Sequence, residues 1–94
     1  MNLEKEIVQS IIDFAEKFDV EKVILFGSRA RGDNRARSDI DIAVQGGNFI
    51  DFHEAMDEET PTLLEFDVAN LSDKLNENFL AEIKRDGVIL YEKI

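Results

Sequence analysis

Two aspartates, Asp39 and Asp41, stand one residue apart in an otherwise apolar segment that continues to Val44. In an extended strand, residues i and i+2 lie on one face with their Cα atoms about 7 Å apart, so both carboxylates would project side by side. Such carboxylates repel each other unless a cation lies between them, and hard divalent cations such as Mg²⁺ bind oxygen ligands of this kind. The pair therefore predicts a metal site.

Ten residues separate Asp39 from an upstream Gly27-Ser28 pair, which ends a first apolar run. Glycine lets the backbone approach a ligand closely, and a serine at the start of a helix offers amide and hydroxyl donors that suit phosphate oxygens. Alone, Gly-Ser would be an ordinary strand-to-helix turn, and Asp-x-Asp would be the solvent-facing side of a half-buried strand. Their combination favours a site for a metal and a polyphosphate.

This combination resembles the signature of the polymerase-β-type nucleotidyltransferases: Gly27-Ser28, ten residues, then Asp39-x-Asp41. The run Gly-Ser-Arg-Ala-Arg-Gly followed by Ser-Asp-Ile-Asp is similar to the minimal, single-domain branch, the minimal nucleotidyltransferase (MNT) domain. The resemblance covers nearly the whole chain. It implies an α/β fold in which helices pack on a small mixed β-sheet of about four strands, the palm-like nucleotidyltransferase core.

The family also places a third acid on a later strand, in an apolar-Asp-apolar setting. Phe66-Asp67-Val68 fits that pattern in an alternating segment, so the resemblance implies Asp67 as the third acid. Glu65 would lie on the same face of the strand and is the alternative, while a solvent-facing strand residue is the plain structural interpretation of Asp67.

A reaction follows from the resemblance. Asp39, Asp41 and Asp67 would be the catalytic acids and would hold two Mg²⁺ ions. Gly27 and Ser28 would bind the β- and γ-phosphates of a nucleoside triphosphate, expected to be ATP. A nucleotidyl group, expected to be AMP, would then move to a hydroxyl group as pyrophosphate leaves in line.

The charge of the chain is uneven. The net charge is −10, yet four of the five arginines fall within nine residues between the Gly-Ser turn and the Asp pair. A small basic spot on an acidic body favours a nucleotide over an extended nucleic acid and leaves acidic surface for a protein partner. Arg29 and Arg31 are predicted to contact phosphate, whereas Arg35 and Arg37 are predicted to be solvated loop residues.

The minimal branch resembles the antitoxin half of two-gene modules whose other half is an all-helical HEPN-type toxin, and some of these antitoxins transfer AMP to a tyrosine of that partner. The resemblance thus implies a HEPN-type partner in a hetero-oligomer. The alternative is a non-catalytic module that neutralises its partner by binding. A small-molecule acceptor is less favoured, because drug-modifying nucleotidyltransferases use an extra domain to hold the antibiotic.

The 94 residues suit one domain, residues 1–94, with room for a single core. The chain has no cysteine, which excludes a disulfide framework and a thiolate metal site, and its start lacks the basic-then-apolar order of a signal peptide. Its apolar runs, such as Val23 to Phe26, are far shorter than the roughly 20 residues that span a bilayer. We expect a cytoplasmic protein.

The order of elements can be predicted from hydrophobic spacing and turn residues. Helices are expected at residues 3–18, 28–32 and 49–59 and from Ser72 to Gly87, and strands at 22–26, 38–44, 63–69 and 88–91.

Overall fold

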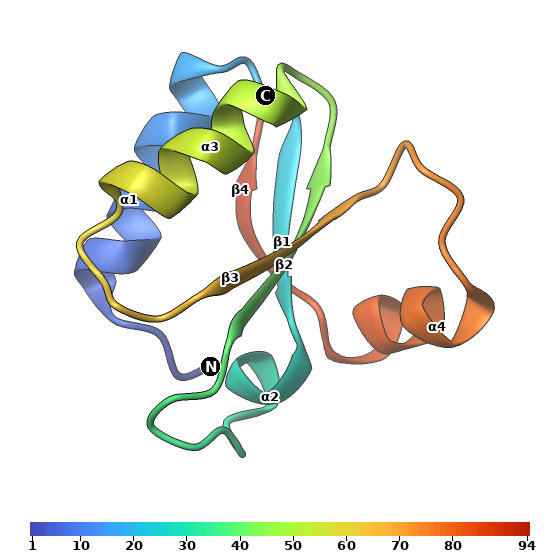
Figure 1. Cartoon of the computed structure of the whole chain (residues 1–94). Coiled ribbons are helices and arrows are strands. Elements are labelled where there is room, and N and C mark those ends of the chain that lie inside the picture. Colours follow the sequence, from blue (N-terminus) through green and yellow to red (C-terminus); the bar gives the residue numbers. More distant parts are fainter.

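Four strands form one mixed sheet in the order β3-β2-β1-β4, as the computed structural model of residues 1–94 shows (Figure 1). The strands are β1 (Lys22–Phe26), β2 (Ile40–Gln45), β3 (Phe66–Asn70) and β4 (Val88–Glu92). β1 pairs antiparallel with both β2 and β4, whereas β2 pairs parallel with β3. Parallel neighbours need a crossover connection, which contains helix α3 (Phe49–Glu59). The predicted α/β fold with a small mixed sheet is confirmed.

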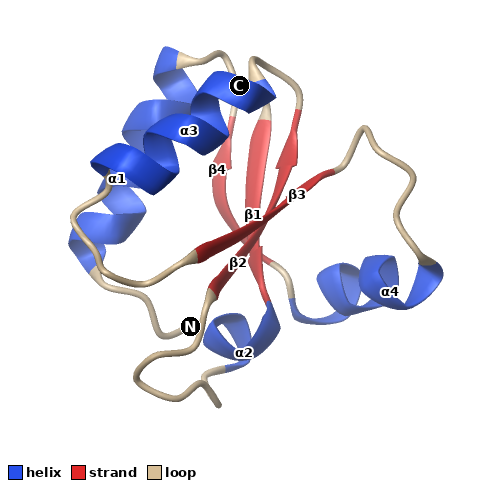
Figure 2. Ribbon diagram, in the orientation of Figure 1, coloured by secondary structure: helices blue, strands red, loops and turns tan.

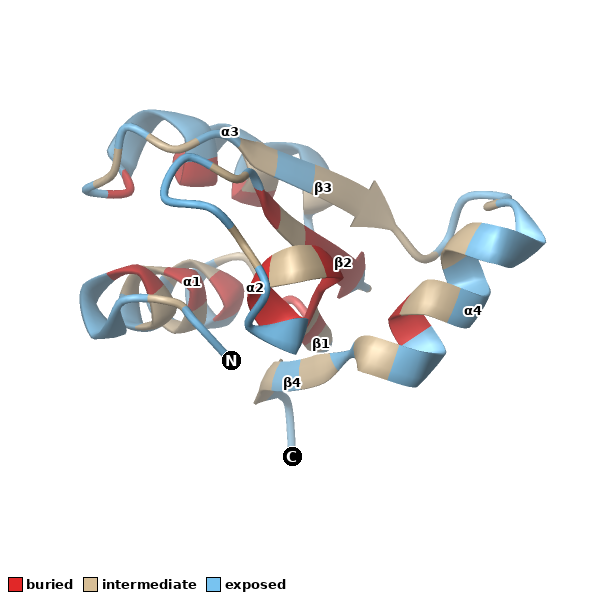
Figure 3. Cartoon of the chain, turned by 90° about the horizontal axis from the view of Figure 1, so that it is seen from below, coloured by how far each residue is buried: buried red, intermediate tan, exposed pale blue.

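The helices are divided between the two faces of the sheet. α1 (Lys5–Lys17) and α3 cover one face, and α4 (Glu77–Asp86) lies on the other (Figure 2, Figure 3). The short α2 (Gly27–Arg31) follows β1 directly at one end of the sheet. None of these helices combines the length and the apolar character that crossing a membrane requires.

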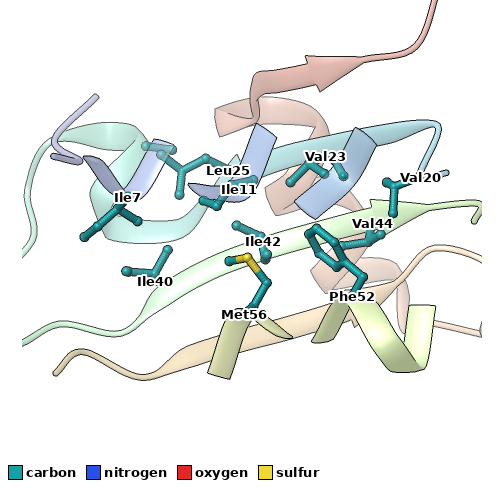
Figure 4. Packing of buried hydrophobic residues seen from close by; sticks show 12 residues of the cluster. Ile7, Ile11, Val20, Val23, Leu25, Ile40, Ile42, Val44, Phe52 and Met56 are labelled. Atoms are coloured by element: carbon teal, nitrogen blue, oxygen red, sulfur yellow. The ribbon is translucent and has the colours of Figure 1, made fainter. Parts of the chain in front are cut away.

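The main core lies between the sheet and the helix pair α1 and α3 (Figure 4). Its fully buried side chains include Ile7 and Ile11 of α1, Phe52 and Met56 of α3, and Leu25 of β1. In β2, Ile40, Ile42 and Val44 alternate into this same core. Because side chains alternate along a strand, Asp41 projects to the opposite face, where α4 lies.

A smaller cluster packs under α4. Phe26 of β1, Ala43 of β2 and Ile83 of α4 are its buried members. The rings of Phe26 and Phe79 meet edge to face, with centroids 5.1 Å apart and planes at 79°. This packing fixes α4 against the sheet on the same face as Asp41.

Several element boundaries differ from the prediction, and three of these differences are the starts of β2, β3 and α4. β2 begins at Ile40 rather than residue 38, which leaves Asp39 exposed just before the strand. β3 begins at Phe66 rather than at Leu63, whose side chain is fully exposed. α4 begins at Glu77 rather than after Ser72, because the side chain of Asn76 accepts a hydrogen bond from the Phe79 amide at 2.7 Å and caps the helix there.

Candidate functional site

The turn between β1 and α2 brings the Gly-Ser pair against Asp41. Gly27 is buried and has a φ of 73°, a left-handed conformation that favours glycine. A side chain at this position would collide with the carboxylate of Asp41. The glycine therefore allows the backbone of the turn to lie directly beside the acid, and the half-buried Ser28 follows at the same place.

Three carboxylates lie on the face of the sheet that Asp41 shares with α4. Asp41 and Asp67 are directly opposite each other in the parallel register of β2 and β3, so their side chains project to the same side. Asp39 precedes Asp41 by two residues, and the backbone of Glu65 accepts a hydrogen bond from Ile40 at 2.9 Å, which sets Glu65 beside Asp39. The pairing of β2 with β3 thus brings together Asp41 and Asp67, which are 26 residues apart in the sequence.

The environment of Asp41 is electrostatically unfavourable for a charge. The pKa of Asp41 is raised to about 6, first by partial burial and then by the charges of Asp67 and Asp39. Glu82 of α4 adds to this effect, whereas Arg31 opposes it. A cation bound here would relieve the repulsion.

Glu82 is the residue at this site that the sequence did not predict. It is half-buried on α4 and comes close enough to Asp41 to raise its pKa. Nothing in the spacing of Glu82 distinguishes it from other acids on a helix surface. Only the packing of α4 against β1 brings it to the site.

Arg31 joins α2 to α4 through a set of ion pairs. Its Nε lies 3.0 Å from Asp33, and its Nη1 lies 3.4 Å from Glu82 and 3.2 Å from Asp86. Asp86 is further held by Arg85 at 2.9 Å, and these hydrogen bonds lower the pKa of Asp86. Arg31 is therefore the one predicted phosphate-binding arginine whose positive charge acts on Asp41.

Arg29 has a different position from the one predicted. Its side chain is buried and donates hydrogen bonds to the backbone carbonyls of Ser38 at 3.0 Å, Ala36 at 3.2 Å and Asn2 at 3.4 Å. The guanidinium thus fastens the loop before β2 and the start of the chain to α2. This arrangement does not favour the predicted phosphate contact of Arg29, because its donors are engaged with the backbone.

The acids fit a divalent cation by their chemistry, since all of their donor atoms are carboxylate oxygens. The chain has no group of three or more aspartate, glutamate or histidine side chains placed closely enough to hold a metal ion. The predicted trio of Asp39, Asp41 and Asp67 shares a face of the sheet but is not drawn together into a ligand set.

Comparison with protein families identifies the chain. Residues 9–94 match the model described as polymerase beta, nucleotidyltransferase. The chain belongs to the polymerase beta nucleotidyltransferase family. Like the other members, it is thus a nucleotidyltransferase, and the family resemblance seen in the Gly-Ser and Asp-x-Asp motifs is confirmed.

Relatives of this nucleotidyltransferase were found by sequence and by structure. "Putative protein adenylyltransferase MJ0604" of Methanocaldococcus jannaschii is 34% identical over 102 residues, which cover 97% of this chain and 100% of the relative. A crystal structure of a toxin-antitoxin with AMP-PNP has a TM-score of 0.72 at 19% identity and covers 92% of this chain and 73% of its own. A mutant of the toxin-antitoxin MntA-HpeT has a TM-score of 0.70 at 20% identity, covering 98% and 75%. These two structures show the shared fold.

Proposed function

We propose that this nucleotidyltransferase moves AMP from ATP to a hydroxyl group of a partner protein, and that the pair forms a toxin–antitoxin module in which this chain is the antitoxin. The observation that carries the proposal is the raised pKa of Asp41, which faces Asp67 and Asp39 and lies beside the Gly27 turn. Acids that repel one another next to a close-approach glycine suit a metal-bound polyphosphate.

The relatives support ATP as the donor and a protein as the acceptor. The sequence relative is named as a protein adenylyltransferase, and one structural relative was crystallised with AMP-PNP, an ATP analogue. The structural relatives are toxin–antitoxin complexes. By the family resemblance, the partner of this chain would be an all-helical HEPN-type protein, and a tyrosine of it would be the acceptor.

Each residue of the site has a role in this proposal. The Gly27 backbone and the Ser28 hydroxyl bind the β- and γ-phosphates, and Arg31, whose charge acts on Asp41, would offset part of their charge. Asp39, Asp41 and Asp67 would be the oxygen ligands for two Mg²⁺ ions. When bound, these ions would neutralise the triphosphate and lower the pKa of the acceptor hydroxyl.

The acceptor oxygen forms a bond to the α-phosphorus while the bond from that phosphorus to the bridging oxygen breaks. Pyrophosphate leaves with the electron pair, on the side opposite to the attacking oxygen. The proton of the hydroxyl passes to a carboxylate, and we assign this role to Asp67, which lies opposite Asp41 in the strand register.

The experiment is incubation of the purified chain with α-labelled ATP, Mg²⁺ and the protein encoded by the neighbouring gene. We expect label on the partner with wild-type chain and none with Asp41→Asn. A tight complex without label in either case would instead support the alternative function, neutralisation of the partner by binding alone.

A further inference from the structure

A pocket of about 480 Å³ adjoins the candidate site. It is lined by Arg37, Asp39, Leu63, Leu64 and Glu65. Asp39 belongs to both the pocket and the candidate acids, so the two are continuous. A pocket of the same volume at the opposite end of β1 contains none of the candidate residues; Glu21, Lys22, Gln45, Glu92, Lys93 and Ile94 line it.

The strand order places this pocket across the acids from the Gly-Ser turn. α2 continues β1, whereas Leu63 to Glu65 lead directly into β3. β2 lies between β1 and β3 and carries Asp41. Because the turn follows β1 and the pocket residues precede β3, the turn and the pocket flank Asp41 of β2 on opposite sides.

This arrangement has a consequence for an in-line transfer, in which the attacking and leaving oxygens lie on opposite sides of the phosphorus. A triphosphate held at Gly27 and Ser28 would release pyrophosphate on the β1 side. We propose that the pocket formed by Arg37 and Leu63 to Glu65 binds the acceptor side chain and delivers its hydroxyl from the β3 side. The inference rests on the proposed nucleotidyl transfer and names the place of its acceptor.

The walls of the pocket fit an aromatic alcohol. Leu63 is fully exposed and Leu64 half-buried, which gives an apolar surface next to an acidic site. Glu65 supplies a carboxylate that can accept a hydrogen bond from a hydroxyl, and it lies beside Asp39. An apolar ring with a polar tip, as in tyrosine, uses both features, whereas the short side chain of serine would leave Leu63 uncovered.

The kinetic test compares wild-type chain with Leu63→Ser and with Ile50→Ser as a matched control. Ile50 is also an exposed aliphatic residue, but it lies on α3 and does not line the pocket. We expect Leu63→Ser to raise the KM for the partner protein about tenfold, because apolar contact with the acceptor is lost. For Leu63→Ser, we expect the kcat and the ATP affinity measured by calorimetry to stay at the wild-type values. For Ile50→Ser, we expect the KM, the kcat and the ATP affinity all to stay at the wild-type values. Equal KM values for the two variants, or weaker ATP binding by Leu63→Ser, would overturn the proposal.

A binding test works without any transfer. The ¹⁵N-labelled chain is titrated with N-acetyl-L-tyrosinamide, with N-acetyl-L-phenylalaninamide as the control that lacks the hydroxyl. We expect the amide signals of Arg37 and of Leu63 to Glu65 to shift, more with the tyrosine compound, while the Ile50 signal stays in place. Glu65→Gln should reduce the difference between the two compounds.

The two tests separate the two proposals. If the wild-type chain labels no partner, the proposed function fails, and the titration still decides about the pocket. Shifts at these four amides that disappear in Leu63→Ser support an aromatic-alcohol site. Their absence in the wild-type chain overturns it, even if the partner is labelled.

Discussion

Burial and like charges act on Asp41 in the same direction, so this carboxylate binds its proton more tightly in the folded chain than in the unfolded chain. Between the ordinary pKa of 3.8 and the raised value of about 6, the folded state carries the extra proton. The stability that Asp41 contributes is therefore present below about pH 4 and is lost as the pH rises through 6. At neutral pH, the charged carboxylate of Asp41 therefore lowers the stability of the folded chain.

Asp41→Asn should consequently stabilise the metal-free chain at pH 7. After discounting for solvent screening of this partly exposed group, we expect a gain of about 1 kcal/mol, or about 5 °C in Tm. The gain should shrink as the pH falls from 7 to 4 in thermal melts. Asp39→Asn serves as the control and should gain less, because Asp39 is exposed. A pH-independent difference between Asp41→Asn and wild type would contradict this explanation.

Ser28→Ala should weaken nucleotide binding and leave the fold intact. A hydrogen bond to a charged oxygen contributes about 1.5–3 kcal/mol, so the Kd for Mg²⁺ and ATP should rise roughly ten- to hundredfold. Isothermal titration measures this value, with the exposed Ser72→Ala as the control. An unchanged Kd for Ser28→Ala would remove the serine from the site.

At the scale of the elements, the side chain of Arg29 connects the loop between α2 and β2 to the start of the chain. Arg29 donates to two carbonyls within this loop, and a third hydrogen bond reaches Asn2 near the start of the chain. Asp39 directly follows Ser38, whose carbonyl accepts one of these hydrogen bonds, so the position of this predicted acid depends on Arg29.

Arg29→Ala should therefore lower stability even without nucleotide. Loss of a buried charged donor to three carbonyls should cost about 2–4 kcal/mol of unfolding free energy in urea denaturation. Arg35→Ala, an exposed position in the same loop, should change it by less than about 0.5 kcal/mol. If both variants are equally stable and Arg29→Ala loses only ATP affinity, the arginine is a phosphate ligand after all.

Most elements could be predicted from the sequence because their signals are local. β1 has the predicted bounds, and α3 begins and ends where the weak pattern placed it. The predicted start of α4 was wrong because the sequence pattern assigned the cap to Ser72, whereas in the structure the side chain of Asn76 accepts the hydrogen bond from the Phe79 amide.

The residues of the candidate site could likewise be predicted only where their signal is local in the sequence. The motif located Asp39, Asp41 and Gly27, since their spacing along the chain carries the signal. Glu82 and the backbone role of Arg29 depend on which segments pack together, and one sequence does not specify that contact. The role of Asp67 was inferred by resemblance, and the β2–β3 register places it opposite Asp41.

At the scale of the whole molecule, nucleotide and metal should stabilise the fold only together. A triphosphate brought to a cluster of acids on a chain of net charge −10 is repelled until a cation reverses the local charge. Ligand at a hundredfold excess over its Kd adds about 2.7 kcal/mol of stability, which shifts Tm by several degrees.

We expect Mg²⁺ and ATP together to raise Tm in differential scanning fluorimetry by more than the sum of their separate shifts. Asp41→Asn should remove this excess. The same ATP shift in chelator as in Mg²⁺ would mean that the acids are not a nucleotide–metal site.

The pairing of β3 has a consequence for the order in which the site is built and lost. β3 is an edge strand, none of its residues is fully buried, and its parallel partner β2 is reached only after the α3 crossover has formed. Long-range parallel pairing forms late in folding, and edge strands with little burial open first in local fluctuations. Hydrogen exchange should therefore be faster in β3 than in β1. Each such opening would separate Asp67 from Asp41 while the core stays folded, so a partner that covers β3 would hold the acids together.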